Sequence, residues 1–310
     1  MSIINASAPS TSDKPMNYAR KAALAMICVL SLGSCSVLGS LYENSPQLVF
    51  WWLDSYVDFK DEQTTAVKEE LRALQKWHRE TQLPQALELI QDLLPQVQND
   101  LSPEKTCEIE KKLLQTVPEV IARLTPMIAK IAPTLSAEQL KNLRASFDKK
   151  NKEWSKEWLT GSPSERLDHQ AEKGLEQAKD LYGRISNAQK WELRNLAQNS
   201  GYDPTKNLAI KLYRQDEIFK ALEKIRSLKS KGTLGTESLV KESEAIVSDW
   251  LNNANLIKDP VLFDYNERRL KANCEAVAAF HNKTTPEQRS KARAKLRDYE
   301  EVIVKLTKPR

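Results

Sequence analysis

The feature that most constrains this chain is a short polar pattern that recurs ahead of apolar helical stripes. Its copies are 101–105 (LSPEK), 135–139 (LSAEQ), 185–189 (ISNAQ) and 284–288 (TTPEQ), with a poorer copy at 59–63 (FKDEQ). A hydroxyl at a helix N-cap accepts a hydrogen bond from the backbone N–H three residues later, and a Gln there bonds back to the cap. The pattern therefore predicts a helix start at each copy.

The roles of the individual residues follow from the same chemistry. We expect four hydroxyl residues to act as N-caps: Ser102, Ser136, Ser186 and Thr285. We expect three glutamines to close capping boxes: Gln139, Gln189 and Gln288. Pro103 and Pro286 then occupy the first helical position, where a missing N–H costs nothing. Each cap stabilises its helix by about 1 kcal/mol.

Composition and periodicity indicate an all-α fold. The chain has only 8 Gly, and no long stretch alternates apolar and polar residues as a strand does. Apolar residues instead recur every three or four positions, as in Leu83, Leu87, Ile90, Leu94, Val97 and Leu101. The last positions of successive copies, 63, 105, 139 and 189, are 34 to 50 residues apart, which suits helical hairpins. We predict an elongated multi-helix bundle of antiparallel helical hairpins.

The N-terminal segment has the layout of a secretory signal. Basic residues precede an apolar run over 22–32, which is shorter than the roughly 20 residues that span a bilayer. The following 32–35 (LGSC) resembles the lipobox of bacterial lipoproteins. The resemblance implies cleavage between Ser34 and Cys35, with lipid attached to Cys35. The alternative is a buried Cys35 after an ordinary signal or a signal anchor, and Met16 is a second candidate for the initiator.

The predicted anchor sets the location and the domain organisation. Ser36 follows Cys35 where Asp would signal retention in the inner membrane, so we expect a lipid anchor in the periplasmic leaflet of the outer membrane. The predicted parts are a signal peptide (1–34), a lipidated Cys with a tether and an aromatic segment (35–57), and helical regions over 58–160 and 161–310. The two regions meet at 160–165 (TGSPSE), or form one continuous domain.

Two details of the segment after the anchor are also predicted. Residues 36–45 have the composition of a short tether. Residues 45–59 then pack as the first helix of the body. The alternative is that this aromatic segment lies against lipid headgroups, where Trp51 and Trp52 are well suited.

Charge and cysteine content limit the partners. The net charge is +5, of which Lys14, Arg20 and Lys21 against Asp13 supply +2. The remaining chain is nearly balanced, so we expect no nucleic-acid partner, and the stripe Arg289, Arg293 and Arg297 is interpreted as a solvated face.

Cys107 and Cys274 form a disulfide in an oxidising compartment or remain two buried thiols, and the sequence leaves both open.

No catalytic or metal-binding motif is recognisable. His78, His169 and His281 are the only histidines, and we predict no enzyme activity, no metal and no cofactor. The sharpest candidate for a functional motif is Trp77, His78 and Arg79 with Pro84, in which His78 is a potential general base. A structural histidine is the favoured interpretation, because no nucleophile accompanies it.

The capping pattern resembles the LTxxQ repeat of small periplasmic proteins of the Spy and CpxP type. The wider layout resembles an uncharacterised family of bacterial lipoproteins over nearly the whole mature chain. That resemblance rests on the lipobox, 58–63 (DFKDEQ), 74–87 (LQKWHRETQLPQAL), 182–189 (YGRISNAQ) and Arg214–Gln215. The chain departs from the repeat by using Ser for Thr and by Lys105 in place of Gln.

These observations favour a protein that works by binding. The resemblance implies a chaperone-like role in envelope homeostasis, with unfolded polypeptides or other envelope proteins as partners. A structural partner of an envelope assembly complex is the alternative. An enzyme that acts on cell wall or lipid ranks third.

Overall fold

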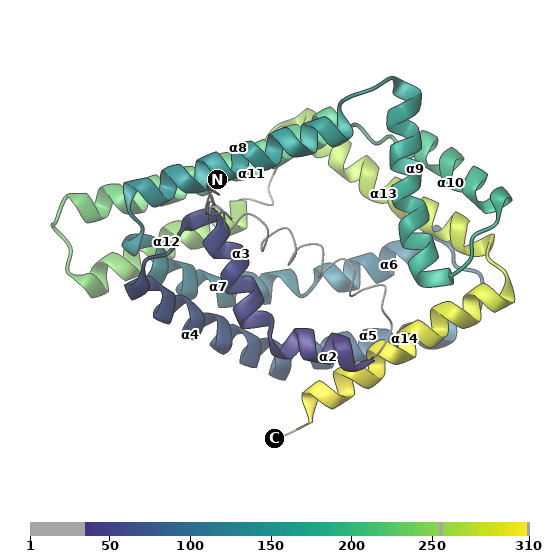
Figure 1. The fold of residues 1–310 in the computed structure, drawn as a ribbon, viewed down its shortest axis with the longest axis horizontal. Coiled ribbons are helices and arrows are strands. Elements are labelled where there is room, and N and C mark those ends of the chain that lie inside the picture. The colour runs from purple at the N-terminus through teal and green to yellow at the C-terminus, as the bar shows by residue number, and fades with distance from the viewer. Residues whose placement is uncertain (1–34, 254–256, 309–310) are drawn as a thin grey trace, which may run out of the picture.

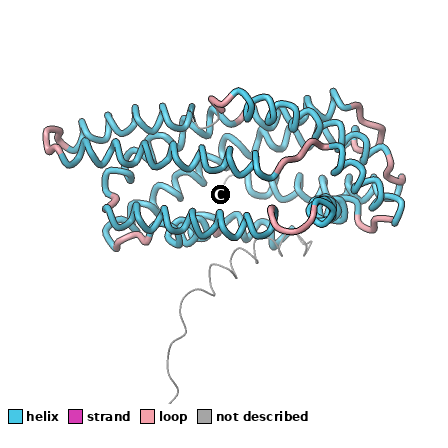
Figure 2. Tube along the Cα trace, turned by 90° about the horizontal axis from the view of Figure 1, so that it is seen from above, coloured by secondary structure: helices cyan, strands magenta, loops and turns pink. Residues whose placement is uncertain are grey.

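The computed structural model describes residues 35–253 and 257–308, and within these residues it contains helices and no strand. The prediction of an all-α helical bundle is therefore confirmed. The predicted signal peptide and its basic residues lie outside the described residues. Figure 1 shows an elongated, frame-like arrangement of helices, and Figure 2 shows from above that most of them run along the long axis.

The helices of the first half are α2 (Cys35–Glu43), α3 (Ser45–Val57), α4 (Asp61–Trp77), α5 (Leu83–Gln96), α6 (Pro103–Leu114), α7 (Val117–Ile131) and α8 (Ala137–Trp158). A π-helical turn, η1 (His78–Gln82), joins α4 to α5, and a 3-10 turn, η2 (Ala132–Thr134), follows α7. The second half contains α9 (Pro163–Tyr182), α10 (Asn187–Asn199), α11 (Pro204–Ser230), α12 (Thr236–Asn253), α13 (Pro260–Asn282) and α14 (Pro286–Thr307).

Packing joins helices that are close in sequence and helices that are far apart. The pairs α3/α4, α9/α10 and α11/α12 are hairpins of successive helices, as predicted. Helix α7 packs on α12, α6 on α13, and α5 on α14, and these pairs bring the two halves of the chain together. In Figure 1, α8 and α11 run side by side along one long edge, and α14 lies with α5 along the opposite one.

The core consists of several separate clusters. The largest gathers side chains from α3, α8, α11 and α12, including Phe219, Ile225 and Val247. A second cluster lies between α9, α13 and α14, around Tyr182, Phe280 and Ala292. Because an amphipathic helix must bury its apolar stripe, each cluster closes one group of helices.

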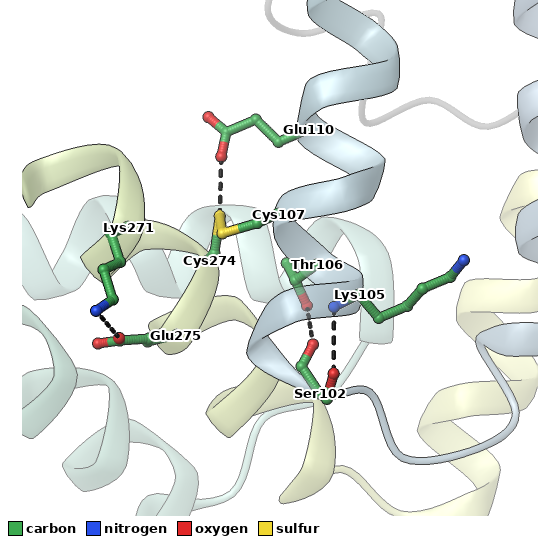
Figure 3. Close-up of a disulfide and its surroundings, with 8 residues drawn as sticks. All are labelled: Ser102, Lys105, Thr106, Cys107, Glu110, Lys271, Cys274 and Glu275. Atoms are coloured by element: carbon green, nitrogen blue, oxygen red, sulfur yellow. Dashed lines mark hydrogen bonds and ion pairs between the residues drawn. A yellow bond between two sulfur atoms is a disulfide. The ribbon is translucent and has the colours of Figure 1, made fainter. Parts of the chain in front are cut away.

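The structure joins Cys107 on α6 to Cys274 on α13 by a disulfide across 167 residues of sequence, with the Cα atoms 5.2 Å apart (Figure 3). Oε2 of Glu110 lies 3.1 Å from Sγ of Cys274. A bridged sulfur carries no proton, so we interpret this approach as a close contact and not as a donated hydrogen bond. The bridge fixes α6 against α13 close to the cap at Ser102, which accepts from the backbone N–H of Lys105.

The segment predicted as a tether differs in the structure. Residues 35–43 form α2, which packs along α14, and Leu38 and Tyr42 contact a cluster made of Leu83, Val302 and Leu306. The tether interpretation overlooked the apolar spacing of Leu38 and Tyr42, which places both on one face of a helix. Helix α3 packs through Phe50 and Val57, whereas Trp51 and Trp52 are about half exposed at 55% and 54%.

Candidate functional site

The capping glutamines are not isolated caps, because the structure brings them together in two buried pairs. The first pair is Gln63, at the start of α4, and Gln139, at the start of α8. Nε2 of Gln139 donates to Oε1 of Gln63 at 2.6 Å, and Nε2 of Gln63 donates back to Oε1 of Gln139 at 3.2 Å. The two helix starts are therefore bonded directly to each other.

Each glutamine of this pair also bonds to the backbone. Oε1 of Gln63 accepts from the N–H of Lys60 at 2.9 Å, and Oε1 of Gln139 accepts from the N–H of Ser136 at 2.9 Å. The Nε2 groups cross over, from Gln139 to the carbonyl of Asp58 and from Gln63 to that of Thr134. Every amide group is satisfied although the side chains are only 7% and 3% exposed.

The second pair repeats this arrangement at the other end of the molecule, between Gln189 on α10 and Gln288 on α14. Their amides bond reciprocally at 2.7 and 3.0 Å, and each Oε1 accepts from the N–H of its own cap, Ser186 or Thr285. Nε2 of Gln189 donates to the carbonyl of Lys283, and Nε2 of Gln288 to that of Arg184. The predicted caps and boxes at 136, 186 and 285 are confirmed.

The glutamine pairs distinguish copies of the capping pattern that look alike in the sequence. Residues 59–63 were read as a poor copy, yet Gln63 is a full member of a pair. Residues 101–105 have the better hydroxyl cap, and Ser102 does cap α6. Lys105, however, has no side-chain amide and forms an exposed ion pair with Glu108. The Gln, and not the hydroxyl, identifies the copies that connect helices.

The predicted motif Trp77, His78 and Arg79 lies where α4 passes into η1 and faces the chain's own α2. The hydroxyl of Tyr42 lies 3.0 Å from Nδ1 of His78, and Arg79 donates to Oε2 of Glu43 at 2.9 Å. Burial lowers the pKa of His78, which favours the neutral ring that can accept from Tyr42. His78 and Arg79 therefore clamp the C-terminal end of α2.

The rest of this motif supports the same junction. Trp77 is half-buried at the end of α4, and Pro84 lies in the first turn of α5, where a proline is tolerated. Gln75 donates to the carbonyls of Tyr42 and Glu43 and to Oγ of Ser45, so it bonds the turn between α2 and α3. All of these contacts therefore join segments of the same chain.

His281 is a buried polar residue that no sequence motif distinguishes. It is 1% exposed, Nδ1 lies 2.8 Å from the hydroxyl of Tyr182, and Nε2 lies 2.8 Å from the carbonyl of Asn99. A carbonyl only accepts, so Nε2 carries the proton and Nδ1 accepts from Tyr182 in the neutral ring. Burial lowers the pKa of His281, and Arg289 nearby acts in the same direction.

This buried histidine predicts a pH dependence of stability. The pKa of His281 is lower in the folded chain than its ordinary value of about 6.5, so the unfolded chain binds more protons between the two values. The free energy of unfolding should fall as the pH drops from 7 to 5, by at most about 1.4 kcal/mol per pH unit for this residue. Urea denaturation at several pH values measures it. His281→Gln should flatten the slope, and a stability that rises on acidification would contradict the assignment.

The basic stripe on α14 is largely engaged by other helices. Arg289 bonds to Asp100 and to the carbonyl of Gln98, and Lys295 forms an ion pair with Asp180. Nε of Arg293 is buried without a hydrogen-bond partner among the described residues. The prediction of a solvated face is therefore incorrect for Arg289, whose side chain is 13% exposed. The stripe joins α14 to α9 and to the turn after α5.

Large apolar side chains are exposed at several places, and three of these places hold adjacent or near-adjacent residues. They are Trp51 and Trp52 on α3, Leu113 and Leu114 at the end of α6, and Val261 and Phe263 at the start of α13, with exposures between 52% and 62%. Trp191 on α10 is 66% exposed. Single exposed apolar residues are normal, but neighbouring ones create small apolar patches on a surface that carries both charges.

The described residues contain neither a membrane-spanning helix nor a cluster of metal ligands. None of the helices over 35–253 and 257–308 is long and apolar enough to cross a membrane. In the same residues, no three side chains among His, Cys, Asp and Glu gather closely enough to hold a metal ion.

The fold and these junctions define an all-helical bundle protein whose helix starts are bonded in glutamine pairs. The chain belongs to a family of unknown function (DUF6279), whose model matches residues 55–248 and so includes Gln63, Gln139 and Gln189. No curated protein and no solved structure matches the chain.

Proposed function

We propose that this protein is a lipid-anchored helical protein of the periplasmic side of the outer membrane, and that it works by binding other polypeptides in a chaperone-like manner. The anchor is Cys35 in the lipobox-like segment, and its role rests on the sequence. The similarity of the caps to LTxxQ repeats of Spy- and CpxP-type proteins belongs to the same proposal.

The observation that carries the binding proposal is the set of paired exposed apolar side chains on α3, α6 and α13. Shallow apolar patches surrounded by charges of both signs attract many sequences without demanding one geometry. His78, the one candidate for a general base, is held by Tyr42 in a clamp on α2, which supports a binding role over an enzymatic one.

The test is suppression of aggregation by residues 36–310. The purified chain should slow aggregation of an unrelated unfolding protein at near-stoichiometric ratios without ATP, and raised salt should weaken the effect. Leu113→Ser with Leu114→Ser and Val261→Ser with Phe263→Ser should reduce the protection. Lys141→Ser with Lys271→Ser, which replaces well exposed lysines on α8 and α13, is the matched control and should not.

Three outcomes would replace this proposal. Equal protection by all variants would show that the exposed apolar patches do not bind the unfolding protein. Failure on several substrates, together with recovery of one envelope protein in a stable complex, would favour the structural partner. Turnover of peptidoglycan or lipid that disappears in His78→Ala would favour an enzyme.

The anchor has a separate test. Mass spectrometry of the mature protein should find acyl groups on a chain that begins at Cys35, and Cys35→Ser should leave the precursor unprocessed and unacylated. A mature chain that begins elsewhere would contradict the anchor and leave the binding proposal standing.

A further inference from the structure

A pocket of about 340 Å³ opens between α9, α10 and α13, at the corner where the turn before α11 also passes. Its size lies within the range of small-molecule sites, roughly 300 to 1,000 Å³. Most of its lining is apolar and comes from Leu181, Leu193, Leu196, Val277 and Phe280. Val277 remains 45% exposed although it borders this apolar surface.

One cation lines this pocket without a partner. Nε of Arg269 is buried and has no hydrogen-bond partner among the described residues, and no carboxylate in that part of the chain forms an ion pair with Arg269. The preceding Arg268 differs, because it is exposed and lies 3.0 Å from Oδ2 of Asp264 on the outer side of α13. A buried guanidinium donor without an acceptor is costly, and an anion in the pocket would supply that acceptor.

A second polar group lines the same pocket as Arg269. Tyr202 also lines the pocket, and burial raises its pKa to about 12, so its hydroxyl keeps its proton. The positive charge of Arg269 opposes part of this rise in the pKa of Tyr202. The neutral hydroxyl of Tyr202 and the unpartnered Nε–H of Arg269 are both hydrogen-bond donors in a mostly apolar pocket, and both suit a carboxylate.

Part of the remaining polar lining is engaged within the protein, and the amides of Gln177 and Asn273 are solvent-exposed. Nε2 of Gln170 donates to Oγ of Ser200 at 2.9 Å, and that hydroxyl donates to the carbonyl of Ala197. The hydroxyl of Tyr182 is engaged with His281. Along the apolar part of the pocket a bound peptide would find no partners for its N–H and C=O groups, whereas an acyl chain has no such groups to satisfy.

We propose that this pocket binds a single-chain anionic amphiphile, with the acyl chain between α9, α10 and α13 and its anionic head group against Arg269 and Tyr202. A free fatty acid and a lysophospholipid share this chemistry. The inference is independent of the polypeptide-binding role and of the anchor, since the pocket lining includes neither Cys35 nor any residue of the paired exposed apolar side chains on α3, α6 and α13.

The experiment is photo-crosslinking of the full chain in lipid nanodiscs. The probe is dodecanoate with a diazirine at the end of its chain, and peptides are mapped by mass spectrometry. The label should appear on α9, α10 and α13. Arg269→Gln should reduce it roughly tenfold, because a charge-assisted bond is lost. Arg268→Gln removes the same charge one residue away and should leave labelling unchanged.

A second variant tests the acyl part of the site. A Cβ added at Gly174 on α9 meets only Cδ2 of Leu193, at 3.8 Å, so Gly174→Leu fits at its base and extends a side chain into the pocket. It should abolish labelling while the melting temperature is kept. Excess unlabelled dodecanoate or a dodecanoyl lysophospholipid should compete, and the stronger competitor identifies the source.

Several results would overturn the inference. Labelling spread over all helices, or unaffected by Gly174→Leu, would mean that the probe only partitions onto the surface. Equal labelling of Arg269→Gln and Arg268→Gln would show that Arg269 does not bind an anionic head group. If an uncharged dodecanol diazirine labels the pocket as strongly as the carboxylate, the anionic head group does not contribute to binding.

Discussion

Replacing Gln139 by Leu is expected to lower the free energy of unfolding by about 3 kcal/mol, although Leu is apolar and the site is only 3% exposed. The change removes the amide that bonds Gln63, the N–H of Ser136 and the carbonyl of Asp58. Each buried group that loses its partner costs about 1 to 3 kcal/mol. Urea denaturation of wild type and variant measures the difference.

The matched control is Glu165→Leu. Glu165 occupies the same third position in the capping box of α9, bonds to the N–H of Ser162, and is solvent-exposed with no partner box. Its replacement should cost about 1 kcal/mol. The double variant Gln63→Leu with Gln139→Leu should lose less free energy of unfolding than the sum of the two single variants, because both changes remove the same hydrogen-bond network. Equal costs for Gln139→Leu and Glu165→Leu would show that pairing adds nothing.

Removal of the disulfide is the second large effect. Cys107→Ser with Cys274→Ser should destabilise the chain by about 4 kcal/mol, because the bridge closes a loop of 167 residues in the unfolded chain. Reductant should lower the stability of wild type by a similar amount and leave the double variant unchanged. That insensitivity is the internal control for reductant acting elsewhere.

The bridge itself has a direct measurement. Non-reducing gels should show a faster band than reducing gels, and Cys107 and Cys274 should resist thiol labelling in the denatured, unreduced protein. Full labelling of both would establish two free thiols and predict no effect of reductant on stability.

Local signals in the sequence predicted the helix starts well. The hydroxyls of Ser136, Ser186 and Thr285 cap the helices expected of them, and Pro103 and Pro286 open α6 and α14. These features depend on atoms within four residues, so a short window of sequence contains the necessary information. The stripes predicted a helical bundle for the same reason.

The partners of these helices were not predictable in the same way. Gln63 looked like a weak cap because Lys60 replaces a hydroxyl, and its role depends on Gln139, which is 76 residues away. Likewise, His281 looks unremarkable until Tyr182 and Asn99 are placed beside it. Periodicity identifies which face of a helix is buried and says nothing about which helix covers it.

The contacts of His78 agree with the structural role that the sequence favoured, whereas a function of the motif Trp77, His78, Arg79 and Pro84 stays a prediction. The segment Trp77–Arg79 is the sharpest candidate motif in the sequence, and the structure shows that His78 and Arg79 contact Tyr42 and Glu43. The signal that could have shown this lies in residues 36–45, where Leu38 and Tyr42 share a helical face. That segment was interpreted as a tether, so its contacts with the body were missed.

The packing of α2 along α14 has a consequence for biosynthesis. The ribosome makes α2 first and α14 last of the described helices, and Val302 and Leu306 cover the same cluster that receives Leu38 and Tyr42. Contacts of such long sequence separation form late, because the intervening chain must first be ordered. A nascent chain therefore carries α2 and the apolar face of α5 without their native cover throughout translation, and only the last turns of α14 complete the molecule.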